Sequence, residues 1–253
     1  MTYDIQKASV TKRISAFLFD GILTAIVVVA VAWLLSAILN YDSYSENLEK
    51  AYDTYADQYG IDFQISQEEY AAMTEEERAN FDAAYAALSA DAEATNNLYM
   101  VFNLTMVMIT GGFLVGILLV EFLVPLILGN GQTLGKKIFG IALVRQDGVK
   151  LNTMQLFVRT ILGKFTIETM LPVYMLIMIF FNIAGIDSLL IIAGIGVAQL
   201  ILLLVTRNKT LLHDLLAGTV AVDMASQMIF KSTDDLIAYQ KKVAAEKATR
   251  QPY

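Results

Sequence analysis

The chain has 253 residues, of which 56% are apolar and 17% are charged, with a net charge of −7, no cysteine and one histidine. Soluble domains average about 45–50% apolar residues, glycine included, and about 25% charged residues, so this composition favours an integral membrane protein. Without cysteine, disulfide bonds and cysteine-ligated metals are excluded, and a single histidine excludes a histidine-rich metal site. We expect no cofactor. We expect no nucleic-acid partner either, because no basic face carries interleaved aromatic residues.

The net charge divides into two regions of opposite sign. Residues 40–97 hold fourteen acidic and two basic residues, a net charge of −12, which leaves +5 for the rest of the chain. An acidic insert within a basic membrane core is therefore predicted. The predicted divisions are the N-terminus with a first span (1–39), the insert (40–97), the remaining membrane core with its loop (98–223) and an amphipathic tail (224–253).

The first apolar run covers residues 14–39 and is interrupted only by Asp20. A membrane-spanning helix needs about 20 apolar residues, so the run predicts a first transmembrane helix. It is too long for the apolar part of a signal peptide, and no small-residue cleavage site follows it.

The insert is predicted to be helical. Three segments have the spacing of a capping box, in which two side chains satisfy each other's free amides at a helix start: Ser43–Glu46, Ser66–Glu69 and Thr74–Glu77. Gly60 is a predicted helix C-cap. Two apolar stripes at helical spacing, expected to pack against each other as an antiparallel pair, are formed by Tyr44, Leu48, Tyr52, Tyr55 and Tyr59 and by Phe81, Tyr85 and Leu88.

The second apolar run, 98–128, contains one acid, Glu121. Gly112 and Gly116 in this run are expected to let another helix of the core approach closely, with dimerisation as the alternative. The glycine-rich segment that follows lacks a Walker A pattern. It predicts instead a short strand over 138–144 that turns at Asp147 and Gly148.

Residues 152–164 predict an interfacial helix whose Arg159 and Lys164 reach toward water. The third and fourth apolar runs, 165–183 and 188–205, are joined by only four residues. Together the runs predict an all-α membrane protein with four transmembrane helices, an extracytoplasmic helical insert and a short cytoplasmic β-like segment. Residues 219–223 are a second strand candidate, and the tail is an amphipathic helix.

Basic residues set the predicted orientation, because lysine and arginine accumulate on the cytoplasmic side. They precede the first span, lie between the second and third, and follow the fourth: Lys7, Lys12, Arg13, Lys136, Lys137, Arg145, Lys150, Arg159, Lys164, Arg207 and Lys209. Four spans place all three segments on one side. Both termini are therefore predicted to be cytoplasmic, and the acidic insert to lie outside a bacterial plasma membrane.

Three sequence blocks carry a resemblance to a known family. They are Gly-Gln-Thr-Leu-Gly-Lys at 131–136, Phe-Val-Arg-Thr-Ile-Leu at 157–162 and His-Asp-Leu-Leu-Ala-Gly-Thr at 213–219. Together with Arg13 and Asp20 in the first span, they resemble the RDD family of bacterial membrane proteins over residues 8–39 and 98–223. The family is named for one arginine and two aspartates, which the resemblance assigns to Arg13, Asp20 and Asp214. Some members are described as sodium/proton antiporters, so the resemblance implies transport.

Ionisable residues within membrane spans are costly and mark either function or paired structure. The antiparallel arrangement of the first two spans places Asp20 and Glu121 at similar depth near the cytoplasmic side. The candidates for an ion or proton site are Arg13, Asp20, Glu121 and Asp214, with Glu168 and His213 as secondary candidates. A desolvated carboxylate can take up and release a proton. The structural alternative is that Arg13 with Asp20, and Glu121 with a lysine, are ion pairs; an acid without a partner favours exchange.

The leading functional hypothesis is transport of a small solute or cation, including cation/proton exchange. Since four spans are few for a transporter, a homo-oligomer in the lipid bilayer is expected. The alternative is a non-transporting membrane anchor or accessory subunit that presents the acidic insert outside. An enzyme is not expected, because no serine or cysteine nucleophile motif accompanies His213 and Asp214.

Overall fold

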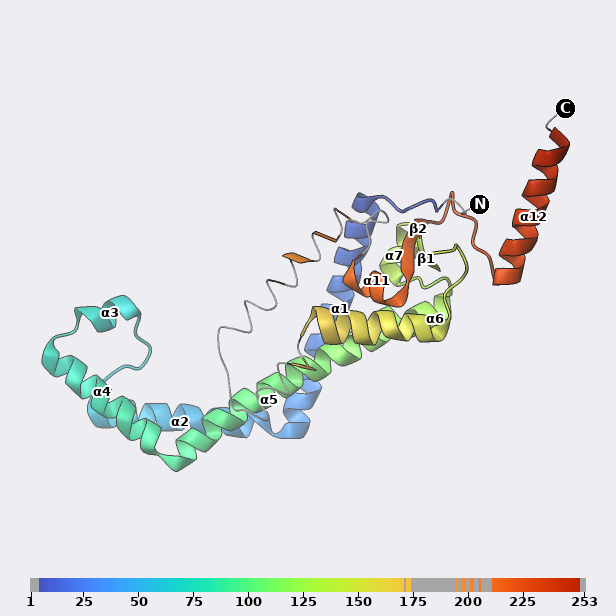
Figure 1. Ribbon diagram of the computed structural model, residues 1–253. Helices are drawn as coiled ribbons and strands as arrows, with labels where there is room; N and C mark the ends of the chain where they lie inside the picture. The colour runs from blue at the N-terminus through green and yellow to red at the C-terminus, as the bar shows by residue number, and fades with distance from the viewer. Residues whose placement is uncertain are drawn as a thin grey trace. The chain divides into compact units, whose positions relative to one another are not determined.

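The computed structural model describes residues 5–170 and 211–250, together with the isolated positions 172, 173, 194, 197, 198, 201, 202 and 205. The chain divides into two compact units, one formed by residues 1–29 and 110–253 and the other by residues 30–109. The described part is mostly helical (Figure 1). Most residues of the predicted third and fourth spans, 165–183 and 188–205, lie outside the described part of the chain.

Two helices are long and apolar enough to cross a membrane. Helix α1 covers Val10–Leu39, and a second stretch covers Ala92–Leu128. The second stretch consists of α5 (Ala92–Ile117), the π-helix η1 (Leu118–Leu123) and α6 (Val124–Leu128). Large apolar side chains on α1, such as Trp33 at 75% exposure, are exposed in the part of the chain that the structure describes. The first two apolar runs are therefore confirmed as helices suited to a membrane.

Two glycines on α5 lie against α1. A Cβ atom on Gly112 would lie 3.0 Å from the carbonyl oxygen of Val28, and one on Gly116 would lie 3.0 Å from Cγ2 of Thr24. Small residues at these positions let the two backbones approach closely. The expectation that this glycine pair packs within the chain is confirmed.

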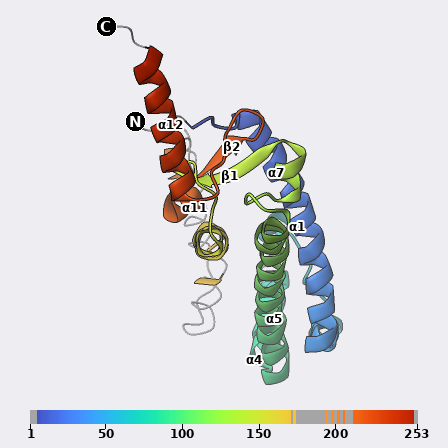
Figure 2. The ribbon, with the colours of Figure 1, turned by 90° about the vertical axis from the view of Figure 1, so that its right-hand side faces the viewer.

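A two-stranded ribbon forms the centre of the first unit (Figure 2). Strands β1 (Ile141–Arg145) and β2 (Thr219–Asp223) pair antiparallel, with Leu143 opposite Ala221. The strand predicted at 219–223 is confirmed, as is the turn at Gly148, whose N–H donates to the Arg145 carbonyl. The other strand begins three residues later than predicted, because α7 (Leu134–Ile138) occupies 138 and Gly140, with φ of 65°, reverses the chain before β1.

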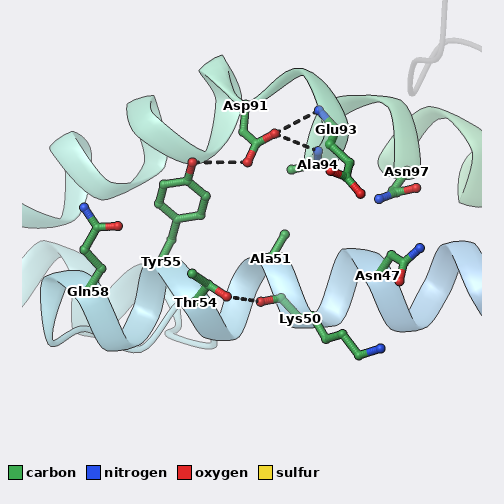
Figure 3. A pocket seen from close by; sticks show the side chains of 10 residues that line it. All are labelled: Asn47, Lys50, Ala51, Thr54, Tyr55, Gln58, Asp91, Glu93, Ala94 and Asn97. Carbon is green, nitrogen blue, oxygen red and sulfur yellow. Dashed lines mark hydrogen bonds between the residues drawn. The ribbon is translucent and has the colours of Figure 1, made fainter.

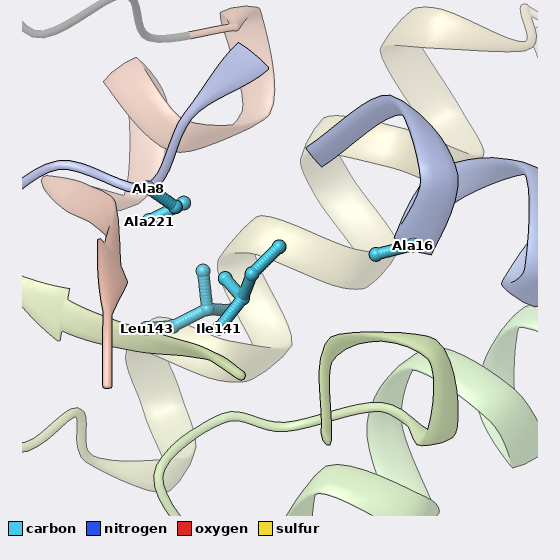
Figure 4. Close-up of a cluster of buried hydrophobic side chains, with 5 residues drawn as sticks. All are labelled: Ala8, Ala16, Ile141, Leu143 and Ala221. Carbon is cyan, nitrogen blue, oxygen red and sulfur yellow. The ribbon is translucent and has the colours of Figure 1, made fainter. Parts of the chain in front are cut away.

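The two faces of the ribbon are both covered. Ala8, Ala16, Ile141, Leu143 and Ala221 form one buried cluster (Figure 4). A second cluster on the other face consists of Ala142, Val144, Val220 and Val222. Successive residues of both strands are therefore buried, with no alternation between buried and exposed side chains. This pattern is typical of strands that are covered on both faces.

The rest of the first unit is helical. Helix α8 (Thr153–Phe157) leads into the π-helix η2 (Val158–Glu168), and α11 (Leu212–Ala217) precedes β2. The helix predicted over 152–164 is thus present and longer than expected. The tail forms α12 (Thr233–Arg250), whose Leu236 packs with Phe230 and Val149.

The second unit contains α2 (Tyr41–Tyr59), α3 (Gln67–Ala72) and α4 (Glu75–Ala90). The capping boxes at Ser66 and Thr74 and the C-cap at Gly60 are confirmed. The predicted cap at Ser43 is wrong. Only Asn40 separates α1 from α2, and its left-handed conformation, with φ of 55°, starts α2 before Ser43 is reached.

Helices α2 and α4 pack through aromatic residues, as the stripes predict. The ring of Phe63 lies 5.4 Å from that of Tyr52 and 5.8 Å from that of Phe81, measured between centroids. One stripe residue is placed differently: Tyr85 is 57% exposed, and Ala84 takes its place in the packed face.

Candidate functional site

The first unit brings all six candidate residues into one buried set of charged and polar groups, here named the charge network. Five further residues connect them, so its members are Arg13, Asp20, Glu121, Thr133, Lys136, Arg159, Lys164, Glu168, His213, Asp214 and Thr219. These residues come from six elements, α1, η1, α7, η2, α11 and β2, which together extend over more than 200 residues of sequence. The convergence expected from topology is therefore present in the structure.

Asp20 is 2% exposed and lies on α1. Thr133 Oγ1 donates to its Oδ2 atom at 2.5 Å, and the Gly135 N–H donates to its Oδ1 atom at 2.8 Å. The ammonium of Lys136 lies 3.8 Å from Oδ2. The buried carboxylate thus has a donor for each oxygen and one neighbouring cation.

The Gly-Gln-Thr-Leu-Gly-Lys block explains how α7 reaches Asp20. Thr133 caps α7 by accepting from the Lys136 N–H at 3.1 Å. A Cβ atom on Gly135 would lie 2.5 Å from the Ala16 carbonyl oxygen and 2.9 Å from the Asp20 carboxylate. No residue other than glycine fits there without displacing one of the two helices.

The first two residues of the block hold its turn against β1. Gly131 has φ of 61°, and a Cβ atom there would lie 2.8 Å from Cβ of Leu143. The side-chain amide of Gln132 donates to the Ile141 carbonyl at 2.7 Å. Glycine is favoured at positive φ because it lacks a Cβ atom. The block therefore joins the ribbon to Asp20.

Glu121 is the second buried carboxylate, at 6% exposure. Its Oε1 atom lies 2.5 Å from the ammonium of Lys164, and its Oε2 atom lies 3.3 Å from that of Lys136 and 3.8 Å from Nη1 of Arg159. Lys136 therefore lies between Glu121 and Asp20. Burial lowers the pKa of Lys136 to about 8, with help from Lys164 and Arg159, although Glu121 opposes the shift.

The π-helix η1 positions Glu121. Pro125 has no N–H to donate to the Glu121 carbonyl four residues earlier. Thr160 of η2 donates its hydroxyl to that carbonyl at 3.2 Å. Single π-helical turns within α-helices are rare and occur often at functional sites.

Asp214 on α11 is the third buried carboxylate. Its Oδ1 atom accepts from Nε of Arg159 at 2.9 Å and from the Thr219 hydroxyl at 2.8 Å. Arg13 Nη2 lies 3.6 Å from its Oδ2 atom. Burial opposes the charge on Asp214, but Arg159, His213 and the hydrogen bond from Thr219 together outweigh it and hold the pKa of Asp214 well below the usual range.

Two sequence-based expectations about arginine are wrong. Arg13 forms its ion pair with Asp214 rather than with Asp20. Arg159 does not reach toward water: it is 3% exposed and bonded to Asp214. Its pKa is raised, because the attraction of Asp214 and Glu121 exceeds the opposing effect of burial. Lys164 likewise turns to Glu121.

His213 is buried beside Asp214 and has a defined proton position. Its Nδ1 atom lies 2.7 Å from Glu168 Oε1, and its Nε2 atom lies 2.9 Å from Nη2 of Arg159. A guanidinium only donates, so Nε2 must be the acceptor and Nδ1 must carry the proton. Burial, followed by the charge of Arg159, lowers the pKa of His213. A Cβ atom on Gly163 would lie 2.6 Å from Cβ of His213, so this glycine permits the contact.

The charge network contains four acidic residues and four basic residues, besides His213. The acids are Asp20, Glu121, Glu168 and Asp214, and the cations are Arg13, Lys136, Arg159 and Lys164. Within the described residues, each of the four acids has a cationic or hydrogen-bonding partner, so the acid without a partner that would favour exchange is not found there. Two buried atoms of the network accept or donate no hydrogen bond there: Arg159 Nη1 and Asp214 Oδ2.

Sequence reasoning selected the acids and missed their partners. Thr133, Lys136, Arg159 and Thr219 lie outside the four predicted transmembrane runs, where a polar side chain does not stand out as it does within a span. The signal that could have found them is their place within the three sequence blocks, each of which contributes a side chain to the network.

A separate groove lies in the second unit, between α2 and the start of α5 (Figure 3). Its volume is about 320 Å³, and it is lined by Asn47, Lys50, Ala51, Thr54, Tyr55, Gln58, Asp91, Glu93, Ala94 and Asn97. Asp91 accepts from the N–H groups of Glu93 and Ala94 and from the Tyr55 hydroxyl. Asp91 therefore caps α5 and ties it to α2, which is a structural role.

A sequence model of the RDD family matches residues 7–218. The chain is 33% identical over 104 residues to the uncharacterized protein YckC of Bacillus subtilis (strain 168), a stretch that covers 41% of this chain and 54% of that relative. No solved structure matches the chain.

Proposed function

The chain belongs to the RDD family of membrane proteins, and from this premise we propose that it exchanges protons for a small monovalent cation at the charge network. The observation that carries the proposal is the position of Lys136, whose ammonium lies 3.8 Å from Asp20 and 3.3 Å from Glu121. Both acids belong to helices suited to a membrane. Ionisable residues at such positions are costly and are retained for function by default.

The exchange step follows from the charges around Lys136. While its ammonium is protonated, it offsets one of the two negative charges that Asp20 and Glu121 carry. Loss of that proton leaves the two carboxylates without this cation, and a monovalent cation from solution then takes its place. One proton leaves for each cation that enters, so the charge of the site is unchanged. The return of a proton to Lys136 releases the cation again.

The lowered pKa of Lys136 makes this step possible near neutral pH. An unperturbed lysine, with a pKa of about 10.4, releases few protons there. At a pKa of about 8 the neutral amine is accessible. Protons and the cation compete for one site, so the apparent affinity for the cation should rise with pH by roughly tenfold per unit below pH 8 and level off above it.

The proposal is tested by replacing Lys136→Arg, which keeps the positive charge but cannot release it. We expect purified protein in liposomes, followed with an internal pH-sensitive dye, to exchange protons for sodium or potassium. The variant should remain folded and lose exchange by on the order of a hundredfold, because it cannot give up a proton. Lys137→Arg is the matched control, since Lys137 is the exposed neighbour.

Exchange by Lys136→Arg at the wild-type rate would refute the role of this lysine. If the wild-type protein dissipates no cation or proton gradient, transport itself is refuted. The second function then applies: a non-transporting membrane anchor or accessory subunit that presents the acidic helices α2–α4. We further propose a multi-pass protein of the bacterial plasma membrane, with both termini cytoplasmic and a homo-oligomeric assembly.

A further inference from the structure

The part of the charge network around His213 supports an inference that deepens the proposed function. The consequence of this inference at Glu121 rests on that function. We propose that His213 is a proton switch: when its Nε2 binds a second ring proton, His213 releases Arg159 and donates a hydrogen bond to Asp214 instead. Arg159 then turns toward Glu121. The switch therefore couples the proton occupancy of His213 to the carboxylate that holds Lys136.

The hydrogen bonds of neutral His213 show why protonation must change them. Nε2 accepts from Nη2 of Arg159 at 2.9 Å. A proton on Nε2 would place two N–H donors, both on positive groups, against each other. Such a contact has no acceptor, so one of the two groups must move.

The two network atoms that form no hydrogen bond lie where the new bonds would form, although Asp214 Oδ2 also faces Arg13 at 3.6 Å. Asp214 Oδ2, an acceptor without a hydrogen bond, is 3.6 Å from His213 Nε2. Arg159 Nη1, a donor without a hydrogen bond, is 3.8 Å from Glu121 Oε2. Buried polar atoms without partners are rare and costly. Movements of less than about 1 Å would bring both distances within the normal hydrogen-bond range of about 2.7–3.2 Å.

The charged groups that face His213 come from two elements in the described part of the chain. Glu168, Arg159 and Lys164 lie on η2, and Asp214 lies on α11 itself. Glu168 and Asp214 favour the protonated ring, whereas burial, Arg159 and Lys164 disfavour it. Because the opposing effects are larger, the pKa of His213 is lowered and the switch operates at acidic pH.

Protonation of His213 should weaken cation binding at the exchange site. Arg159 is a permanent cation, and its approach to Glu121 would offset the carboxylate charge that attracts a cation. Acidic pH should therefore weaken cation binding twice, once by protonating Lys136 and again by protonating His213. The second effect should begin only below the ordinary histidine pKa of about 6.5.

The single histidine of the chain allows a direct test without a transport assay. Full-length protein labelled with ¹⁵N-histidine and ¹⁵N-arginine is titrated in lipid nanodiscs by NMR. At pH 7.5 we expect one imidazole with a protonated Nδ1 and an unprotonated Nε2. On acidification, the ring should titrate with a pKa below about 6.5, and the Arg159 side-chain resonance should shift in the same titration.

A Glu168→Gln variant provides the second measurement. Glutamine can still accept from Nδ1–H, so the tautomer should be kept, while loss of the negative charge should lower the pKa of His213 further. A neutral Nε2–H tautomer, an unchanged pKa in the variant, or a titration that leaves Arg159 unaffected would overturn the switch. Because these readouts do not depend on ion flux, a failure of transport would leave them standing and would refute only the proposed exchange.

Discussion

Gly135 shows how closely a single residue can control the Asp20 site. Its N–H donates to Asp20, and a Cβ atom there would lie 2.5 Å from the Ala16 carbonyl. We expect Gly135→Ala to lower stability by about 1–3 kcal/mol, the usual cost of an overpacked core position. The measurement is the thermal unfolding midpoint of detergent-purified protein, which should fall by several degrees.

Gly21→Ala is the matched control for this prediction. Gly21 lies next to Asp20 on α1, and a Cβ atom there would meet nothing within 4 Å. Alanine is a better helix former than glycine by about 1 kcal/mol, so this variant should be as stable as the wild type or more so. Equal midpoints for both variants would show that α7 is not held closely against α1.

At the level of residues, the sequence identified charged positions but not their partners. Arg13 and Asp20 are seven residues apart on one helix face, which suggested an ion pair. Two helical turns separate them by about 10 Å along the axis, and the guanidinium contacts Asp214 instead. Partner choice depends on which loops return to the helix, and one sequence does not contain that information.

The packing of α2 on α4 can be tested through its aromatic residues. The ring of Phe81 contacts those of Phe63 and Tyr70, with centroid distances of 5.8 and 5.5 Å. Phe81→Ala should destabilise the second unit by on the order of 2 kcal/mol, because the ring is partly buried and its removal leaves a cavity. Limited proteolysis should then cut within residues 60–75 faster than in the wild type.

Tyr85→Ala is the control for the helix packing, since Tyr85 is 57% exposed. Its proteolysis rate should match that of the wild type. Faster cutting in Tyr85→Ala than in Phe81→Ala would instead support the stripe expected from the sequence, in which Tyr85 is packed.

Elements defined by neighbouring residues were predicted well, and those that depend on distant contacts were not. The capping boxes at Ser66 and Thr74 form as expected, because both partners lie within four residues. The π-helices η1 and η2 were not predicted. Their apolar pattern resembles that of an α-helix, and the contact of Thr160 with the Glu121 carbonyl forms only in the folded chain.

For the whole molecule, the composition and the apolar runs were sufficient to predict membrane helices and an acidic insert. Two of the four predicted spans correspond to helices of suitable length. The pairing of β1 with β2 brings residues 141–145 and 219–223 together. This pairing requires both segments to lie on the same side of the membrane, and the proposed four-span topology is compatible with that. The ribbon itself was only partly predicted, because its strands are separated by more than 70 residues of sequence.

Orientation in the membrane is the last prediction, and the absence of cysteine from the chain makes it directly testable. Residues 40–97 carry −12, and the segments that flank the first two spans on the other side are basic. Lysine and arginine are retained on the cytoplasmic side. A membrane-impermeant maleimide should therefore label Asp57→Cys on intact cells and Lys150→Cys only after the cells are permeabilised. Both positions are exposed, so access to the side chain does not limit the reaction. Labelling of Lys150→Cys on intact cells would reverse the proposed orientation, and would place the charge network near the outer surface.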